Sequence, residues 1–319
     1  MAQVYSSAWI VALVAALAIP VVGQQPAGQG APAQGRPGGA APAGQGAGRG
    51  GPPPAPPAIK QVKPGVYMVT GLGGNSTVRV TDQGIILVDT KNRGDVNYKA
   101  LMDLVKTVSQ APVKYVFITH HHQDHSGNIG NFQDAGALVI VHENLNKNLE
   151  TYNPPQGKPA LAKSNYRKDR KVKLGKASAV AYHFGRGHTG GDTIVYFPDV
   201  KVISTGDVVV AAAPNVDFPF GGSLVEYQQV LDKILKLDFD TAIPGHGNDP
   251  MTKADVQAFK KKLDTVISRA KELVAKGTAK DQLFAQLKTD DIGWNLNNPQ
   301  WTQPARLDPL YDELSKATK

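Results

Sequence analysis

The chain is organised around one stretch, Thr119-His120-His121-His122-Gln123-Asp124-His125-Ser126-Gly127-Asn128, in which four of the ten residues carry an imidazole. It directly follows residues 115–118, whose β-branched and aromatic side chains predict a buried strand. The stretch therefore lies where a strand ends and a loop begins, a common place for chemistry on a rigid scaffold. Imidazole nitrogens and carboxylate oxygens are the ligands that suit Zn²⁺ where no thiolate is present, and this chain has no cysteine.

Three later residues stand in a similar context. His188 follows Gly187 and precedes a predicted strand at 193–197, and His246 follows the predicted strand 240–243 and a glycine. Asp207 ends the apolar run 203–206. Four strand ends thus each deliver a metal-binding type of side chain with glycine nearby. A surface histidine patch or a tract that binds metal incidentally explains a single cluster, but it does not explain this repeated placement.

In this order the ligands resemble the metallo-β-lactamase superfamily over roughly residues 60–250. The family pattern is His-x-His-x-Asp-His, then a later His, a bridging Asp and a final His between glycines. The resemblance implies a four-layer αββα sandwich of the metallo-β-lactamase type, with Asp89 supporting the ligands through hydrogen bonds. It assigns seven metal ligands: His120, His122 and His188 to one metal, Asp124, His125 and His246 to the second, and Asp207 as the bridge between them.

The same resemblance implies a hydrolase with two Zn²⁺ ions. A water that bridges two such metals has a pKa near neutrality, and the resulting hydroxide attacks a carbonyl that the metals polarise. Asp124 and Asp207 are the candidate catalytic carboxylates, and their charges favour two metals over one. The expected substrates are small molecules with an ester, lactone, thioester or β-lactam amide bond. The zinc β-lactamases of the family generally carry Cys or Ser where this chain has Asp207.

Three alternatives remain open at this stage. The first is an iron-dependent oxygenase of the same fold, although its diiron branch has Glu where this chain has His122. The second is a phosphodiesterase-type hydrolase. The third is a binding module with a degenerate site, which all seven ligands argue against. Metal content separates the oxygenase from the hydrolases, and a chain whose stability ignores chelation would favour the binding module.

Composition predicts three segments. Residues 1–23 are expected to be an export signal, because 8–22 form an apolar run that ends in small residues. A membrane anchor is the alternative, but the run is shorter than the roughly 20 residues that span a bilayer. Residues 24–58, rich in Gly, Pro, Ala and Gln, are expected to be a disordered linker. Residues 59–319 are predicted to be the hydrolase domain with C-terminal helices, exported to the periplasm or secreted.

Apolar periodicity predicts the elements within that domain. A helix is expected at 94–108, with Val96, Leu101 and Val105 among its apolar positions, and another around 225–235. A longer helix is expected at 252–276, starting at a sequence close to a capping box. Residues 71–75 are either a substrate lid or an ordinary hairpin turn, and 152–170 are predicted to be a loop or irregular insertion. Strands are expected at 66–69, 76–80, 85–89, 137–141 and around 180–182. Alternating strands and helices indicate a layered α/β fold.

The remaining histidines and the net charge suggest no further partner. His142 is interpreted as a helix-start residue, His121 as pointing away from the ligands, and His183 as structural, with a place at the site's rim as the alternative. The chain carries a formal net charge of +8. Its basic residues are interpreted as spread over solvated faces, without the stripe of cations and stacking aromatics that a nucleic-acid partner needs. No stable membrane span is expected, and the oligomeric state stays open.

Overall fold

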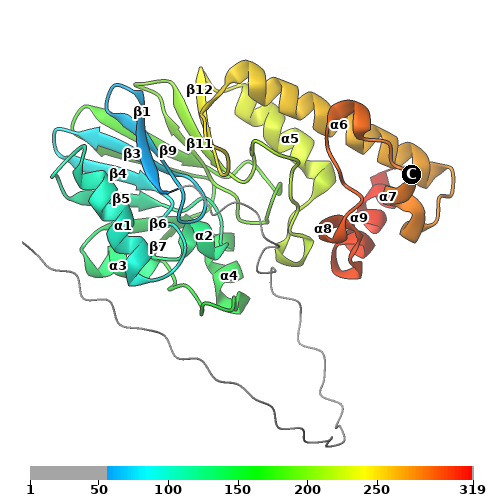
Figure 1. Ribbon diagram of the computed structural model, residues 1–319, viewed down its shortest axis with the longest axis horizontal. Helices are drawn as coiled ribbons and strands as arrows, with labels where there is room; N and C mark the ends of the chain where they lie inside the picture. Colours follow the sequence, from blue (N-terminus) through cyan, green and yellow to red (C-terminus); the bar gives the residue numbers. More distant parts are fainter. Residues whose placement is uncertain (1–55, 318–319) are drawn as a thin grey trace, which may run out of the picture. The chain divides into compact units, whose positions relative to one another are not determined.

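The computed structural model describes residues 56–317, which form two β-sheets packed face to face between helices (Figure 1). The predicted export signal and all but the last three residues of the predicted linker lie outside the described residues. Within 56–317 no helix combines the length and the apolar character needed to cross a membrane. The α/β fold predicted from the sequence is confirmed.

The first sheet of the described region is antiparallel at one end and parallel at the other. Its strands lie in chain order, with antiparallel pairs up to β4 and parallel pairs from β4 to β7. The strands are β1 (Ala58–Lys63), β2 (Val66–Thr70), β3 (Ser76–Thr81), β4 (Gly84–Val88), β5 (Val113–Phe117), β6 (Leu138–His142) and β7 (Ser164–Tyr166). The parallel pair β4 and β5 directs the ends that precede Asp89 and His120 to the same edge.

The second sheet of residues 56–317 has the order β13-β12-β11-β10-β9-β8. Its strands are β8 (Asp169–Leu174), β9 (Ala177–Tyr182), β10 (Ile194–Phe197), β11 (Val202–Gly206), β12 (Thr241–Pro244) and β13 (Met251–Thr252). Strands β11 and β12 are parallel, and the others pair antiparallel. The parallel pair places Asp207 and His246, which follow these two strands, at one edge of the sheet.

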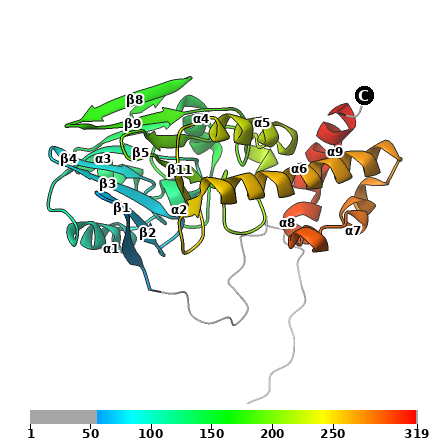
Figure 2. The same ribbon diagram turned by 90° about the horizontal axis from the view of Figure 1, so that it is seen from above.

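The helices cover the outer faces of both sheets. The described α-helices are α1 (Asp95–Lys106), α2 (Gln123–Ser126), α3 (Ile129–Asp134), α4 (Glu143–Thr151), α5 (Leu224–Leu235), α6 (Lys253–Ala275), α7 (Leu283–Gln286), α8 (Pro299–Thr302) and α9 (Pro304–Ala317). Short 3₁₀ turns are η1 (Phe218–Phe220), η2 (Lys280–Gln282) and η3 (Asp290–Ile292). Figure 2 shows α6 running from the sheets to the cluster of α7, α8 and α9.

Four buried apolar clusters lie between the layers of the described region, and the smallest joins β2 to β11 and β12. Leu101 and Val105 of α1 pack with Ile129 of α3 against the first sheet. Phe117 of β5 and Phe197 of β10 belong to the cluster between the two sheets. A third and larger cluster joins the second sheet to α5, α6 and the C-terminal helices. The burial of apolar side chains on both faces of each sheet is what the αββα arrangement requires.

The region 152–170 is more ordered than the sequence suggested. The expected loop or irregular insertion contains β7 and the start of β8, which pairs along its whole length with β9. The alternation of apolar and polar residues along β8 is partly hidden. Val172 and Leu174 face the core, whereas the four remaining residues of the strand are all charged. Periodicity alone does not identify so polar a strand.

Strand β8 also concentrates the charge of the protein. Residues 167–176 contain six basic and one acidic residue, so they supply +5 of the formal net charge of +8. All six basic residues are exposed, and β8 is an edge strand of its sheet (Figure 2). Basic residues are therefore less evenly spread than their distribution along the sequence suggested. Exposed cations on an edge strand oppose pairing with another chain, which explains the cluster without a ligand.

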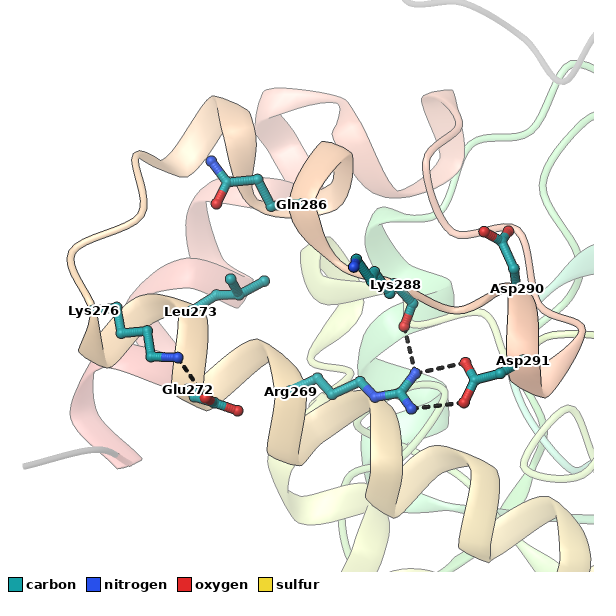
Figure 3. A pocket seen from close by; sticks show the side chains of 8 residues that line it. All are labelled: Arg269, Glu272, Leu273, Lys276, Gln286, Lys288, Asp290 and Asp291. Carbon is teal, nitrogen blue, oxygen red and sulfur yellow. Dashed lines mark hydrogen bonds and ion pairs between the residues drawn. The ribbon is translucent and has the colours of Figure 1, made fainter.

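Arg269 ties the C-terminal segment to the middle of α6. Its guanidinium donates two parallel hydrogen bonds of 2.7 Å to the Asp291 carboxylate and one of 2.6 Å to the Lys288 carbonyl (Figure 3). The cleft beside it, about 660 Å³, has three basic and three acidic residues in its lining. Glu272 and Lys276 form an ion pair on its other side. The cleft is thus largely charge-balanced by its own side chains.

The start of α6 confirms the sequence prediction. The Thr252 hydroxyl accepts a hydrogen bond from the Asp255 N–H, and the Asp255 carboxylate accepts one from the Thr252 N–H, which completes a capping box. The exchange satisfies two backbone donors that the first turn of a helix otherwise leaves without a partner. The cap also fixes the residue at which the chain leaves β13 for α6.

We expect Thr252→Ala to lower the free energy of unfolding by about 1 kcal/mol, because it removes the N-cap acceptor. Urea unfolding followed by circular dichroism at a fixed zinc concentration measures the change. Thr265→Ala is the matched control, since that hydroxyl donates to the Lys261 carbonyl inside the helix and caps nothing. Equal losses in the two variants would contradict a capping role for Thr252.

Candidate metal centre

The loops that carry the ligands are fixed to one another by backbone contacts. The N–H of Thr193 donates to the Thr119 carbonyl at 2.7 Å, and the N–H of Gly245 donates to the Gly206 carbonyl at 2.9 Å. Gly206 has a φ of +51°, and a Cβ at this position would lie 2.4 Å from Thr119 Oγ1. Glycine is therefore required for the ends of β5 and β11, which lie in different sheets, to approach this closely.

The first ligand group contains His120, His122, His188 and Asp207. One ligand atom from each lies within 4.8 Å of the others. His188 Nε2 is 3.0 Å from His122 Nδ1, so these two nitrogens face a common point. His120 Nε2 is buried and has no hydrogen-bond partner among the described residues. An orphaned imidazole nitrogen beside two others and a carboxylate matches the donor set of a divalent metal site.

The second group contains Asp124, His125 and His246, whose ligand atoms also lie within 4.8 Å of one another. His246 Nε2 is 3.2 Å from Asp124 Oδ2 and 3.3 Å from His125 Nε2. His125 is fully buried, whereas the His246 side chain is 46% exposed and lies at the opening. The three side chains have the composition and the proximity to hold a second cation.

Asp207 lies between the two groups and presents one oxygen to each. Its Oδ1 is 3.2 Å from His125 Nε2 and 3.4 Å from His246 Nε2. Its Oδ2 is 3.7 Å from His188 Nε2 and 4.0 Å from His120 Nε2. The residues present therefore fit two metal ions that share one carboxylate.

Burial and charge divide the imidazoles into two kinds. Burial lowers the pKa of His188 to about 4 and holds that of His120 well below its usual value. Burial also opposes the charged form of His246, but hydrogen bonds to Asp124 and Asp207 raise its pKa to about 9. Where no metal is bound, His120 and His188 are thus neutral, and protons on the imidazoles of the second group compensate the neighbouring carboxylates.

Asp89 holds the second group from behind, as predicted. Its carboxylate accepts hydrogen bonds from the N–H and the hydroxyl of Thr119, both at 2.8 Å, and lies 2.7 Å from His125 Nδ1. The contact leaves His125 Nε2 pointing at the ligands, because the other ring nitrogen is engaged. Gly74 packs against the same imidazole, and a Cβ there would lie 2.1 Å from the ring.

The segment 71–75 is anchored to the centre at its far end. Gly74 donates its N–H to the Asp124 carbonyl, and Asn75 donates to the carbonyls of Gly245 and Pro244. Both residues are buried. Lys91, which is fully buried, donates hydrogen bonds of 2.7 Å to the Val69 and Gly74 carbonyls. Residues 74 and 75 therefore form part of the floor of the site, so neither belongs to a lid.

Asp217 is the contact that the sequence did not reveal. Its carboxylate lies 2.8 Å from His122 Nε2, the ring nitrogen that points away from His188. It is 5% exposed and comes from the loop after β11. Nothing in the surrounding Val216-Asp217-Phe218-Pro219 matches a motif, so only the folded chain shows the pairing. A carboxylate on the outer nitrogen of a metal-binding imidazole fixes its tautomer and orientation.

The backbone carbonyl of Asn215 does the same for His188, at 2.8 Å from Nδ1. Thr119 Oγ1, which donates to Asp89, lies 3.1 Å from His120 Nδ1. Neither contact could be read from the sequence, because one uses a main-chain atom and the other a common hydroxyl. All three imidazoles of the first group are thus held through the nitrogen that faces away from the ligands.

The other histidines lie outside the seven-residue set. His121 is fully buried beside Phe220 and Tyr152, with Nε2 3.7 Å from Asp217. Together with His122 and Asp217 it forms a third close group, but that group uses the nitrogen of His122 that already contacts Asp217. The prediction that His142 starts a helix is confirmed, since its Nδ1 accepts from the Asn144 N–H at the start of α4.

His183 stacks on His142, with ring centroids 3.8 Å apart, and its Nδ1 lies 2.8 Å from the Asp192 carbonyl. Its place is structural, and the alternative of a ligand at the rim of the site is not supported.

Comparison with known proteins decides the family. The model of the metallo-beta-lactamase superfamily matches residues 69–246. The chain belongs to this superfamily. The match covers more than half of the chain and includes all seven predicted ligands. Membership makes the protein a metal-dependent hydrolase of a family that usually uses zinc.

Relatives of the chain include metallo-beta-lactamases. It is 27% identical over 186 residues to metallo-beta-lactamase IND-1 of Chryseobacterium indologenes, which is 57% of this chain and 75% of the relative. It is 25% identical over 205 residues to metallo-beta-lactamase type 2 of Bacillus cereus, or 60% of this chain and 76% of the relative. In both cases the aligned region leaves about two fifths of this chain without a counterpart.

Solved structures confirm the fold. A metallo-beta-lactamase from Pontibacter korlensis superposes with a TM-score of 0.58 at 19% identity, covering 66% of this chain and 99% of that one. The stereoselective inverting sec-alkylsulfatase Pisa1 from Pseudomonas sp. gives 0.60 at 17% identity, covering 82% of this chain and 50% of that one. At such identities the likeness establishes the αββα architecture of this superfamily member and nothing further.

We expect Asp217→Asn to weaken zinc binding at the first group about 10- to 100-fold, since the amide fixes the His122 tautomer less strongly than the carboxylate. Competition with a chromogenic chelator measures the affinity. Asp134→Asn, which changes an exposed Asp at the end of α3 that has no ion pair among the described residues, is the control. An unchanged affinity in the Asp217 variant would remove it from the centre.

The opposite pKa shifts predict opposite contributions of His188 and His246 to the pH dependence of stability in the metal-free enzyme. His188 contributes stability above its unfolded pKa of about 6.5 that is lost as the pH falls towards 4. His246 contributes stability below about 6.5 that is lost as the pH rises towards 9. Urea unfolding in chelator at several pH values measures both limbs.

Saturating zinc should abolish the alkaline loss, because ligation holds His246 neutral at every pH in this range. His246→Gln should also abolish it in the metal-free enzyme. If metal-free wild type and His246→Gln lose equal stability between pH 6.5 and 9, the raised pKa of His246 does not contribute.

Proposed function

We propose that the protein is an exported hydrolase that uses two zinc ions to cleave an acyl bond in a small molecule, of the ester, lactone, thioester or β-lactam amide class. The observation that carries this proposal is the position of Asp207, whose two carboxylate oxygens face the two ligand groups separately. When bound, two zinc ions supply a water of lowered pKa and a Lewis acid for the carbonyl oxygen. Seven ligands for two ions are His120, His122, Asp124, His125, His188, Asp207 and His246.

The residues of the chain prepare this chemistry by their charge. Neutral His120 and His188 leave the first metal with a high net positive charge, which favours ionisation of a bound water. Asp124 and Asp207 supply the anionic ligands. Burial raises the pKa of Asp207, but the neighbouring His125 imidazole outweighs burial and holds that pKa well below its ordinary range. Neither carboxylate is therefore available as a proton donor near neutral pH.

The choice of an acyl substrate rests on two further supports. Relatives of the chain at 24–27% identity are named metallo-beta-lactamases. This chain, however, bridges its ligand groups with Asp207 where zinc β-lactamases generally carry Cys or Ser. A carboxylate bridge is a harder and more anionic ligand than a thiolate. Ester, lactone and thioester substrates therefore belong beside β-lactams in the proposed range.

Export is supported by the sequence alone. The apolar run at 8–22 precedes a stretch of Gly, Pro, Ala and Gln that extends to residue 58, and the whole chain lacks cysteine. We propose cleavage near residue 23 and a periplasmic or secreted enzyme in which that stretch precedes the hydrolase domain. Zinc that is bound by nitrogen and oxygen ligands alone tolerates an oxidising compartment, because no thiolate is present to be oxidised.

Metal content and turnover test the proposal together. We expect about two zinc ions per chain, and hydrolysis of at least one member of a panel (a chromogenic β-lactam, an aryl ester, a lactone, a thioester and a phosphodiester). The activity should disappear in chelator and return with zinc. Asp207→Asn should retain the fold and lose more than about 100-fold in rate, since it removes the shared anionic ligand.

Other outcomes identify other chemistry. Iron with little hydrolysis would replace the hydrolase proposal by the oxygenase of the same fold. Turnover of the phosphodiester alone would keep the two metals and change the substrate class. A chain that binds no zinc and whose unfolding is insensitive to chelator would leave only a binding role.

A further inference from the structure

A groove of about 420 Å³ lies beside the loops that carry two of the metal ligands. One side is formed by residues 210–212, which begin three positions after Asp207. The second is formed by residues 248–251, which begin two positions after His246. Helix α6 and Trp294 complete it. Helix α6 and Trp294 lie beyond residue 246, the last one matched by the family model, so this part of the groove belongs to the chain's own extension.

One wall of the groove is joined to the loop that carries His246. The N–H of Ala211 donates to the His246 carbonyl at 3.0 Å, so a wall of the groove is bonded to the backbone of a ligand. At Gly247, with a φ of +131°, a Cβ would lie 2.8 Å from the Ala211 Cβ. Both Ala211 and His246 are exposed. A molecule with its reacting bond at the metals can therefore extend over Ala211 into the groove.

The interior of the groove is mainly apolar. Phe259 of α6 and Trp294 form a tilted aromatic pair, with ring centroids 5.3 Å apart, and Met251 and Ala258 lie beside them. Such a lining favours an alkyl or aryl group over a polar one.

The charged residues of the lining are not equivalent. Asp249 forms an ion pair with Lys60, and Asp255 is engaged in the capping box of Thr252. Lys262 holds its ammonium 5.7 Å from the centroid of the Trp294 ring. Within residues 56–317 this ammonium has no carboxylate partner, and the lining positions one turn away on α6, 258 and 259, are apolar. The groove thus offers a largely apolar wall in which Lys262 is the one cation of the lining, while the Asp255 carboxylate keeps its charge within the capping box.

We propose that this groove binds the distal part of the substrate, an apolar segment that ends in a single negative charge such as a carboxylate or sulfonate. This inference rests on the proposed acyl-bond hydrolysis, because it places the reacting bond at the metals. Lys262 pairs with the anion, and Phe259 and Trp294 pack against the segment. The substrates that the enzyme prefers are therefore anionic amphiphiles, which a neutral ester of equal length does not match.

Binding is measured separately from turnover, so that a failure of the groove proposal can be distinguished from a failure of the proposed hydrolase function. The probe is a short-chain alkyl sulfonate below its micelle-forming concentration, because sulfonates are poor zinc ligands. It is titrated into the zinc-loaded full chain and followed by tryptophan fluorescence, beside the neutral alcohol of the same chain. The variants are Lys262→Met and the control Lys261→Met, which removes the exposed neighbouring cation on α6.

We expect Lys262→Met to raise the Kd of the sulfonate about fivefold, in the range of one partly exposed ion pair, and to leave the Kd of the alcohol unchanged. Lys261→Met should bind both probes like the wild type. Ala258→Trp, which fills the groove, should weaken both. An equal sulfonate affinity in wild type and Lys262→Met overturns the proposal, as does equal weakening in the two lysine variants.

Turnover of a short and a long substrate then separates the hydrolase function from the role of the groove. Nitrophenyl acetate, which is too short to reach the groove, tests the hydrolase alone and should be unaffected by Lys262→Met. The nitrophenyl monoester of a straight-chain dicarboxylic acid should show a KM about fivefold higher in Lys262→Met, with kcat unchanged. If nitrophenyl acetate and the panel of acyl substrates are not hydrolysed, the proposed function fails, while the sulfonate titration still decides whether the groove binds anionic amphiphiles.

Discussion

The structure depends on the burial of one carboxylate among imidazoles. Asp207 is 9% exposed, and nitrogens of four histidines lie within 4.0 Å of its oxygens. An ionised carboxylate taken from water to such a place is strongly destabilised unless cations compensate it. Protons on His125 and His246 can supply that compensation, and so can two divalent metals. Two cations are therefore needed to compensate the buried negative charge, and the ligand loops hold the side chains that can bind them.

That compensation requires the imidazoles to keep one orientation, and the chain provides this with atoms behind the ligands. The Asp217 carboxylate holds His122 and the Asp89 carboxylate holds His125. A backbone carbonyl holds His188. The turn behind them is strained, since Asp89 and Lys91 have φ values of 63° and 68° in a region that residues other than glycine rarely adopt. Burial lowers the pKa of Lys91 to about 7, although Asp89 and Asp124 oppose the shift. Strain and desolvation are thus concentrated in the segment that orients His125.

The sequence predicted most elements from local rules, and its family resemblance named the seven candidate ligands whose side chains lie together in the fold. The His-x-His-x-Asp-His spacing, the capping box of α6 and the apolar face of α1 are all contained in short stretches. Its errors arose where the environment decides. Val96 continues the helical pattern of Leu101 and Val105 but is 81% exposed in the first turn of α1. The predicted irregular segment 152–170 included the start of β8, because the charges of that strand mask the alternation that places Val172 and Leu174 in the core.

The partners of the ligands could not be predicted for a related reason. Asp217 is 95 residues from His122, and the Lys91 ammonium donates its hydrogen bonds to backbone carbonyls, so no sequence spacing predicts either contact. The groove beside the centre has the same origin. Strand β13 and the cap at Thr252 start α6 within a few residues of His246, so the helix cannot shift without moving that ligand. Arg269 and the apolar packing of α7, α8 and α9 then hold the segment with Trp294 against α6. The extension beyond the family region is thereby connected through α6 and β13 to the loop that carries His246.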